Sequence, residues 1–274
     1  MDMKTESIMA QSQASKPDYG LDAPGVVRNL FLCAAAGLLV WASVKIGLWS
    51  GIVSIPISND TLNIEFTGMG LGFGIGLSFT GFWMIWDSKI GKLRGREELL
   101  GKLQWSGNEQ VLDLGCGRGL LLIGAAKRLT TGKATGIDIW QTEDLSGNSQ
   151  DATMKNIQLE GVVDRTEIKT ADMRELPFAD GTMDVVVSRA AIHNLYSKAD
   201  RARAIKEVIR VLKPGGRALI EDIRHGNEYA TVFSEHGCSN IQRLGSAIIA
   251  FFAMLVTAGS LRPTTLLVTK SISA

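Results

Sequence analysis

A short glycine-rich stretch has the residue types and spacing to hold a nucleotide-like ligand. The sequence GCGRG at 115–119 follows the apolar run QVLDL and comes before the helix-like run LLLIGAAKRL. Glycines at alternate positions let a ligand approach bare backbone, and the first turn of the next helix offers amide donors. Asp138 ends the following strand-like run, KATGID, where its carboxylate can accept hydrogen bonds from both hydroxyls of a ribose. These residues fit a dinucleotide and S-adenosylmethionine about equally well.

The elements that must position these residues alternate between strand-like and helix-like patterns. Short β-branched and apolar runs indicate strands at 110–115, 133–140, 165–172, 183–189 and 217–223. Helix-like patterns fill the intervals between several of these runs. The alternation predicts an α/β fold with a doubly wound parallel sheet, which binds ligands at the carboxyl ends of its strands.

The chain carries four characteristic segments in order: VLDLGCGRG, GIDIW, TADMRELPFADGTMDVVVSRAAIHNL and RVLKPGG. In this order and spacing they resemble the successive motifs of class I S-adenosylmethionine-dependent methyltransferases. The resemblance covers roughly residues 89–274 and favours S-adenosylmethionine over a dinucleotide as the cofactor. It implies a Rossmann-like seven-stranded sheet, whose seventh, antiparallel strand residues 264–272 could supply.

The resemblance also implies a role for individual residues in holding the cofactor. In the family the glycine-rich turn cradles the methionine part. The residues of that turn here are Asp113, Gly115, Gly117 and Gly119. Asp138 would hold the ribose hydroxyls, and Ile139 would pack on the adenine. Asp172 would accept a hydrogen bond from the adenine amino group and Met173 would donate its backbone amide. Ser188 would lie near the methionine amine.

His193 and Asp222 are the candidate catalytic residues. A methyltransferase needs a base only if the acceptor must lose a proton before it attacks the methyl group. His193 lies in SRAAIHNLY, after the fourth strand, a stretch that borders the transferable methyl in the family. This stretch lacks the Asn-Pro-Pro-Tyr-type signature that amino and DNA methyltransferases of this fold carry there. The alternative role for His193 is to cap the next helix. Asp222 ends the fifth strand, beside the further polar candidates Glu221, Arg224 and His225.

A second glycine cluster, GMGLGFGIG at 68–76, has a different setting. It lies inside the apolar run at 64–86, which is long enough for a membrane helix, and the run at 30–49 is a second candidate. A phosphate-binding loop would need a strand before it and an amphipathic helix after it. Gly68, Gly72 and Gly76 share one helix face, where small residues let two helices approach closely. The sequence therefore predicts a two-helix transmembrane hairpin; the alternative is a buried hairpin in a soluble protein.

Charge around this hairpin predicts its orientation. Lys16 and Arg28 precede the first helix, several basic residues follow Trp86, and the linker has no Lys or Arg beyond Lys45. The positive-inside rule then places both termini in the cytoplasm, with two spans in the cytoplasmic membrane. The expected domains are a disordered tail at 1–25, the hairpin at 26–86, an amphipathic connection at 87–109 and the methyltransferase domain at 110–274. The connection either lies along the membrane surface or packs on the domain.

Composition limits the other classes of function. The formal net charge of +1 argues against nucleic-acid binding driven by bulk charge. The three cysteines are widely spaced and indicate neither a disulfide framework nor a metal site. An NAD-dependent oxidoreductase stays open as an alternative, as does a membrane protein that binds S-adenosylmethionine and acts on a protein partner.

The apolar segment at 246–261 bears on the acceptor. It is either a pair of core strands or a lid that dips into the membrane. Together with the predicted anchor it favours a small, membrane-partitioned acceptor: a lipid, a quinone-like or isoprenoid-like compound, or an apolar thiol or amine. The sequence does not choose the receiving atom or the oligomeric state.

Overall fold

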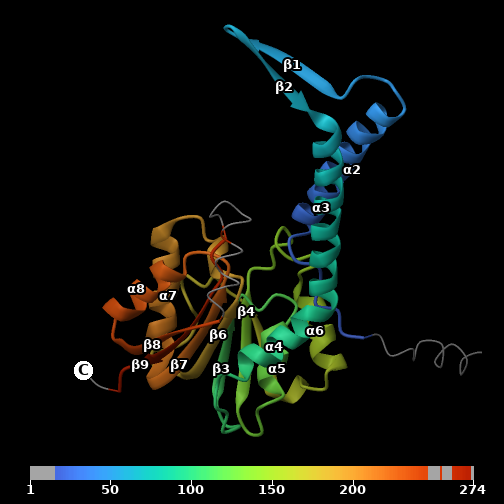
Figure 1. Ribbon diagram of the computed structural model, residues 1–274. Helices are drawn as coiled ribbons and strands as arrows, with labels where there is room; N and C mark the ends of the chain where they lie inside the picture. The colour runs from blue at the N-terminus through green and yellow to red at the C-terminus, as the bar shows by residue number, and fades with distance from the viewer. Residues whose placement is uncertain (1–15, 246–253, 255–260, 273–274) are drawn as a thin grey trace, which may run out of the picture. The chain divides into compact units, whose positions relative to one another are not determined.

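The computed structural model describes residues 16–245, 254 and 261–272 (Figure 1). The chain divides into two compact units. The larger unit contains residues 93–140 together with most of the chain after 148, and the smaller contains residues 20–92 with 141–147. The apolar segment predicted at 246–261 lies almost entirely outside the described residues.

The larger unit is built on a seven-stranded sheet in the order β5-β4-β3-β6-β7-β9-β8. Its strands are β3 (Gln110–Leu114), β4 (Lys133–Asp138), β5 (Thr166–Thr170), β6 (Met183–Arg189), β7 (Leu212–Asp222), β8 (Cys238–Leu244) and β9 (Thr264–Lys270). The first five are parallel, whereas β9 runs antiparallel to both β7 and β8. This confirms the predicted doubly wound sheet and its antiparallel seventh strand.

Helices cover both faces of the sheet (Figure 1). They are α4 (Lys92–Leu100), α5 (Leu120–Ala126), α6 (Gln150–Leu159), α7 (Lys198–Val211) and α8 (Gly226–Glu235), with short 3₁₀ turns η2 (Val163–Arg165) and η3 (Ile192–Asn194). Successive strand residues point to opposite faces. Val186 therefore packs in one apolar cluster with Phe233 of α8, and its neighbour Val187 packs in the other with Leu100 and Ile123.

A buried carboxylate joins β3 to the first helix of the sheet. The Asp113 side chain is almost fully buried, and its Oδ2 accepts a hydrogen bond of 2.7 Å from the Leu122 backbone N–H. The first N–H groups of a helix have no partner within the helix, and the residue before α5 is Gly119, which has no side chain to cap them. Burial raises the pKa of the Asp113 carboxyl to about 7.

Residues 16–19 belong to the larger unit, so the expectation of a disordered tail over 1–25 is wrong for this part. Tyr19 is buried, and its hydroxyl donates a hydrogen bond of 2.7 Å to Glu160 at the end of α6. Arg96 of α4 donates to the same hydroxyl oxygen at 3.3 Å. A polar, glycine- and serine-containing run is typical of disorder, but one aromatic side chain with a fitting pocket is enough to hold it.

The connection predicted at 87–109 contains a π-helical turn, η1 (Asp87–Gly91), followed by α4. Leu99, Leu100 and Leu103 are buried in the apolar cluster of α5. Of the two alternatives, these three leucines support packing on the domain.

The smaller unit contains two long helices, α2 (Pro24–Lys45) and α3 (Phe66–Trp86). By length and composition, Pro24–Lys45 and the continuous helical stretch Phe66–Leu100 could each cross a membrane. Only 11% and 17% of their most apolar windows are buried, whereas the core helix of a soluble protein would be mostly covered. The first helix begins and ends earlier than the predicted 30–49.

The linker between the helices is a β-hairpin, which the sequence analysis missed. Strands β1 (Ile52–Ile57) and β2 (Asp60–Glu65) pair antiparallel, with Ile55 opposite Leu62. Strand β1 contains Pro56, which an edge strand tolerates because one of its sides has no hydrogen-bonding partner. The second helix therefore begins at Phe66 rather than at 64.

The helices touch through a different glycine face from the one predicted. A Cβ atom on Gly70 would lie 2.7 Å from the Gly37 carbonyl oxygen, and one on Gly74 would lie 2.6 Å from the Leu38 side chain. The predicted contact residues Gly68, Gly72 and Gly76 have nothing within 4 Å of such an atom. Residues two apart on an α-helix point about 200° away from each other. Glycine at every second position therefore makes two stripes on nearly opposite faces, and the sequence cannot tell which one meets α2.

We expect Gly70→Ala to weaken the packing of α2 on α3, while Gly72→Ala leaves it intact. The new methyl group at 70 has no room and costs about 1–3 kcal/mol, whereas at 72 it meets open space and gains helix propensity. Unfolding of the full chain in detergent micelles by added SDS, followed by circular dichroism, measures the difference. Equal sensitivity of the two variants would contradict the helix contact.

We expect Asp113→Asn to flatten the dependence of stability on pH. In the unfolded chain an Asp carboxyl ionises near pH 4, but in the folded domain it stays protonated up to about pH 7. The stability that this raised pKa contributes is present below about pH 4 and is lost as pH rises towards 7, by about 4 kcal/mol at most. Asn cannot titrate.

Urea unfolding at several pH values between 4.5 and 7.5 measures this slope in the wild-type chain and in the variant. Asp164→Asn, at an exposed position, is the control. The same slope in wild type and Asp113→Asn would mean that Asp113 titrates normally.

Candidate active site

The glycine-rich turn after β3 adopts a backbone that requires glycine. Gly115, Gly117 and Gly119 all have positive φ, at 73°, 51° and 85°. The N–H groups of Gly115 and Cys116 both donate to the Ile137 carbonyl oxygen at 2.9 Å, which fixes the turn against β4. A Cβ on Gly115 would lie 2.5 Å from the Ala191 Cβ, so the turn also abuts the segment that follows β6.

Two polar side chains of α6 brace this turn from behind. The buried Thr153 hydroxyl donates to the Gly117 carbonyl oxygen at 2.7 Å, and the Asn156 side-chain amide donates to the Arg118 carbonyl oxygen at 2.9 Å. Asn156 also exchanges hydrogen bonds with the backbone of Asp18, which forms an ion pair of 3.1 Å with Arg118. The sequence analysis missed all of these residues. The sequence feature that could have indicated them is the pair Thr153 and Asn156, two polar residues three positions apart on the buried face of α6.

Asp138 links the end of β4 to the glycine turn. Its Oδ2 accepts a hydrogen bond of 2.8 Å from Gly117, and its Oδ1 accepts from the Trp140 backbone at 2.6 Å and from the Asn148 amide at 3.2 Å. A carboxylate offers about four lone-pair sites, and these three hydrogen bonds leave about one of them for a ligand hydroxyl. The adjacent Ile139 is 50% exposed and presents an apolar surface beside this carboxylate.

The residues predicted around the adenine lie after β5. Asp172 is held by Arg174, whose Nε and Nη2 lie 3.0 and 2.6 Å from its Oδ2, and this hydrogen bonding lowers the pKa of Asp172. The sequence analysis did not anticipate Arg174. The end of the Met173 side chain lies near Gly115, 3.6 Å from where a Cβ would stand.

Ser188 and Cys116 face inward. The Ser188 side chain is buried, and its hydroxyl donates to the Leu114 carbonyl oxygen at 2.8 Å, tying β6 to β3. Its place near the methionine amine stays a prediction. Burial raises the pKa of the Cys116 thiol, and the charges of Asp113 and Asp138 raise it further, so the thiol stays protonated.

The two candidate catalytic residues are in direct contact. His193 Nδ1 lies 2.5 Å from Asp222 Oδ1, and the His193 backbone N–H donates to Oδ2 at 3.0 Å. Asp222 is buried and also accepts from the Tyr229 hydroxyl at 3.1 Å and from the Ile223 backbone at 2.8 Å. Burial raises the pKa of Tyr229 and Asp222 raises it further, so Tyr229 remains a donor. The sequence analysis missed Tyr229.

The strand ends bring these two sets of residues together. Asp138, His193 and Asp222 all follow or end strands at the carboxyl edge of the sheet, as predicted. Ala191, which abuts Gly115, lies two residues before His193. The glycine turn and the His193–Asp222 pair are therefore neighbours, and a ligand held by the turn would border His193.

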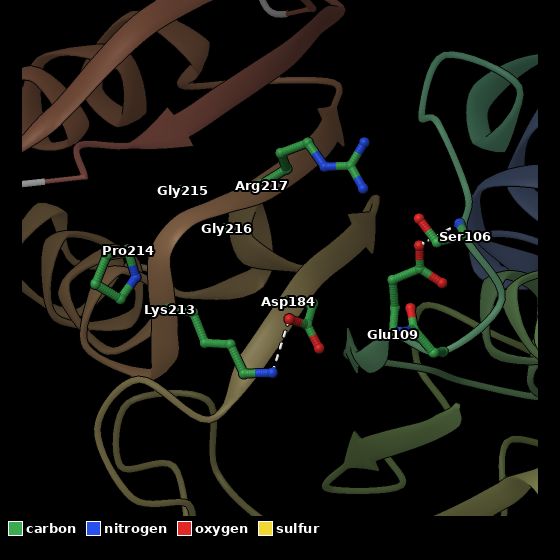
Figure 2. A pocket seen from close by; sticks show the side chains of 9 residues that line it. Ser106, Glu109, Asp184, Lys213, Pro214, Gly215, Gly216 and Arg217 are labelled. Atoms are coloured by element: carbon green, nitrogen blue, oxygen red, sulfur yellow. Dashed lines mark hydrogen bonds and ion pairs between the residues drawn. The ribbon is translucent and has the colours of Figure 1, made fainter. Parts of the chain in front are cut away.

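A separate pocket of about 270 Å³ lies at the opposite edge of the sheet (Figure 2). It is lined by Glu109 before β3, by Asp184 near the start of β6 and by Lys213, which forms an ion pair of 2.7 Å with Asp184. The amino ends of the strands face this pocket, so it is not part of the candidate active site.

Comparison with known proteins identifies the fold of this site. Residues 112–220 match the family model described as "Methyltransferase domain". A sterol 4-C-methyltransferase of Caenorhabditis elegans is 36% identical over 135 residues, which are 49% of this chain and 37% of that protein. The chloroplastic 2-phytyl-1,4-beta-naphthoquinone methyltransferase of Arabidopsis thaliana is 34% identical, over 48% of this chain and 50% of that protein. The chain thus spans half or less of the length of these two relatives.

The fold also matches solved structures. The crystal structure of geranyl diphosphate C-methyltransferase from Streptomyces coelicolor with S-adenosyl-L-homocysteine superposes with a TM-score of 0.51 at 17% identity. The match covers 65% of this chain and 75% of that one. The left-handed glycines and the Asp138 carboxylate fit the methionine and ribose parts of S-adenosylmethionine. Residues 112–220 therefore match a methyltransferase domain with a Rossmann-like sheet, and S-adenosylmethionine is the cofactor that this site fits.

Proposed function

We propose that the whole protein is a membrane-anchored methyltransferase that transfers a methyl group from S-adenosylmethionine to a small, apolar acceptor. One observation carries the proposal: the glycine turn contacts the segment that contains His193, and His193 pairs with the buried Asp222 at the carboxyl edge of a methyltransferase sheet. The family match argues against an NAD-dependent oxidoreductase.

Different residues of the chain bind the cofactor and accept a proton from the acceptor. When bound, S-adenosylmethionine supplies a methyl group on a sulfonium sulfur, a carbon that already bears a good leaving group. The glycine turn and Asp138 hold the methionine and ribose parts. Ile139, Asp172 and Met173 border the adenine. Much of the rate enhancement then comes from fixing the acceptor in line with the methyl group and excluding water.

His193 acts as the base for an acceptor that must lose a proton. The Asp222 carboxylate can only accept, so His193 donates its Nδ1–H to it and keeps the lone pair on Nε2. This arrangement fixes both the tautomer and the ring orientation, as in other His–carboxylate pairs that act in proton transfer. Tyr229 and two backbone N–H groups stabilise the negative charge of Asp222.

The acceptor is proposed to partition into the membrane: a lipid, a quinone-like or isoprenoid-like compound, or an apolar thiol or amine. Two helices with the composition of membrane spans support this, as do relatives named for sterol and naphthoquinone methylation. The protein is then a two-span protein of the cytoplasmic membrane, with both termini and the methyltransferase domain in the cytoplasm. The basic residues that follow Trp86 support this orientation.

The test is to incubate membranes containing the full chain with methyl-labelled S-adenosylmethionine. Label that appears in the organic extract, and only when the chain is present, supports the proposal. Label found only in protein would favour action on a protein partner instead, and no labelled product would exclude methyl transfer under these conditions. A carbonate wash that releases the chain from the membrane would exclude the anchor.

We expect His193→Ala and Asp222→Asn to lower the rate of methyl transfer by roughly 10²–10⁴-fold, the usual contribution of a positioned base. Neither residue belongs to the cofactor cradle, so the affinity for S-adenosylmethionine should stay within a factor of about two, which is well below the 1.4 kcal/mol of a tenfold change. Initial rates and calorimetric titrations measure the two effects. His236→Ala, at an exposed histidine, is the control. An unchanged rate in both variants would mean that the His193–Asp222 contact is structural; the earlier alternative, that His193 caps the next helix, is wrong, because Ser197 caps α7.

We expect deletion of residues 1–86 to weaken cofactor binding more than deletion of residues 1–15. Both truncations keep the glycine turn, but only the longer one removes Asp18 and Tyr19. Asp18 contacts Arg118 and Asn156 beside that turn, and Tyr19 donates a hydrogen bond to Glu160 at the end of the same helix, α6. Calorimetric titration with S-adenosyl-L-homocysteine compares the two proteins with the full chain carrying Tyr19→Ala. Equal affinities in all three would mean that residues 16–19 pack on the domain without supporting the turn.

A further inference from the structure

A second charged pair lies at the carboxyl edge, on the other face of the sheet from Asp222. Arg189 ends β6, and its register partner in the neighbouring strand β7 is Glu221. Arg189 Nε lies 2.7 Å from Glu221 Oε1. Strand residues two apart share a face, so Arg189 follows Val187 and Glu221 follows Leu219, both in the cluster of α4 and α5.

This pair is close to the cofactor turn along the chain. Ala190, the next residue, has a φ of 51°, which is unusual for a residue other than glycine, and its N–H donates to the Glu221 carbonyl oxygen at 2.9 Å. The left-handed backbone of Ala190 is followed directly by Ala191, which lies against Gly115. Backbone strain of this kind is concentrated at functional sites. Arg189 and His193 therefore belong to one short segment, which lies beside the cofactor turn.

The guanidinium of Arg189 has an unused donor. Its Nη1 is buried, and no atom in the described part of the chain accepts a hydrogen bond from it. The backbone of Gly95 in α4 lies on the same side as Nη1. A Cβ atom on Gly95 would lie 3.2 Å from both terminal nitrogens of Arg189. An unpaired buried donor is destabilising and calls for an explanation such as a bound water or a ligand.

We infer that Arg189 binds an oxygen atom of the methyl acceptor, and that the acceptor is an apolar molecule carrying a carbonyl, enol or phenol oxygen. A quarter of the Arg189 side chain is exposed. The inference requires a rotation about the last bonds of the Arg189 side chain, which turns Nη1 away from Gly95 towards the acceptor oxygen while Glu221 stays close to the guanidinium. Guanidinium can only donate hydrogen bonds, so it disfavours a protonated amine, and a thiol is a weak acceptor. This inference rests on the proposed function and selects one class among its acceptors.

The test compares Arg189→Met with Arg203→Met, a control at an exposed arginine paired with Glu175. Membranes containing each full-length chain are incubated with methyl-labelled S-adenosylmethionine and increasing amounts of lipid extract. We expect Arg189→Met to lower kcat/KM for the extract at least tenfold, while the affinity for S-adenosyl-L-homocysteine changes less than twofold. Arg203→Met should behave like the wild type. Millimolar methylguanidinium should restore part of the rate of Arg189→Ala, which a purely structural role would not predict.

The outcomes are separable. If the wild-type chain labels nothing, the proposed function fails and this inference falls with it. If the wild type is active but Arg189→Met keeps its kcat/KM, or loses cofactor affinity to the same extent, Arg189 does not bind the acceptor. Mass spectrometry of the labelled product gives an independent check. A methylated amine or thioether without a nearby oxygen would overturn the assignment of acceptor class even if the variant were impaired.

Discussion

The contact between Gly115 and Ala191 is the constraint on which the rest of the site depends. With no side chain at 115, the turn after β3 and the segment after β6 approach until a Cβ would stand 2.5 Å from Ala191. Gly115 also has a φ of 73°, so any side chain there would be strained as well as crowded. One strand end therefore positions the cofactor turn, and the next positions His193. Because the two strands are hydrogen-bonded neighbours, the separation between the glycine turn and His193 is set by the sheet itself.

Glycine serves a different physical purpose in each of its two clusters. In the turn at 115–119 it provides left-handed backbone and, at Gly115, close approach of the segment that follows β6. In α3 the backbone is helical, and Gly70 and Gly74 only remove bulk where α2 packs. Flanking sequence distinguishes the two uses, since one cluster follows a strand-like run and the other lies inside an apolar run. The sequence could not resolve the two opposite glycine stripes of α3, because the choice depends on the shape of α2 rather than on α3.

Local patterns predicted most of the sheet and the outline of the site, whereas contacts between distant segments were not predictable. The strands β3 to β6 and the placement of Asp138, His193 and Asp222 at one edge follow from alternation and motif order, and the antiparallel β9 follows from the family resemblance. Strand β7 begins at Leu212, before the predicted 217, and the bounds of β8 were not predicted. The 2.5 Å contact between His193 and Asp222 does not, because it depends on how η3 and β7 meet across 29 residues. The docking of Tyr19 on Glu160, 141 residues away, has no local signal at all. The β-hairpin at 52–65 was missed for another reason: its two strands are short and exposed, so they show no alternation between buried and exposed residues.

The carboxyl edge of the sheet is chemically asymmetric, and the asymmetry follows from the strand period. Glu221 and Asp222 are consecutive in β7 and so point to opposite faces. On one face Asp222 holds His193, which keeps a lone pair on Nε2 and can accept a proton. On the other face Glu221 neutralises Arg189, which can only donate. A single pair of adjacent acidic residues thus gives the edge a proton acceptor on one side and a hydrogen-bond donor on the other. An acceptor molecule lying across the ends of β6 and β7 would meet both, with its reacting atom near the base and its polar oxygen near the guanidinium.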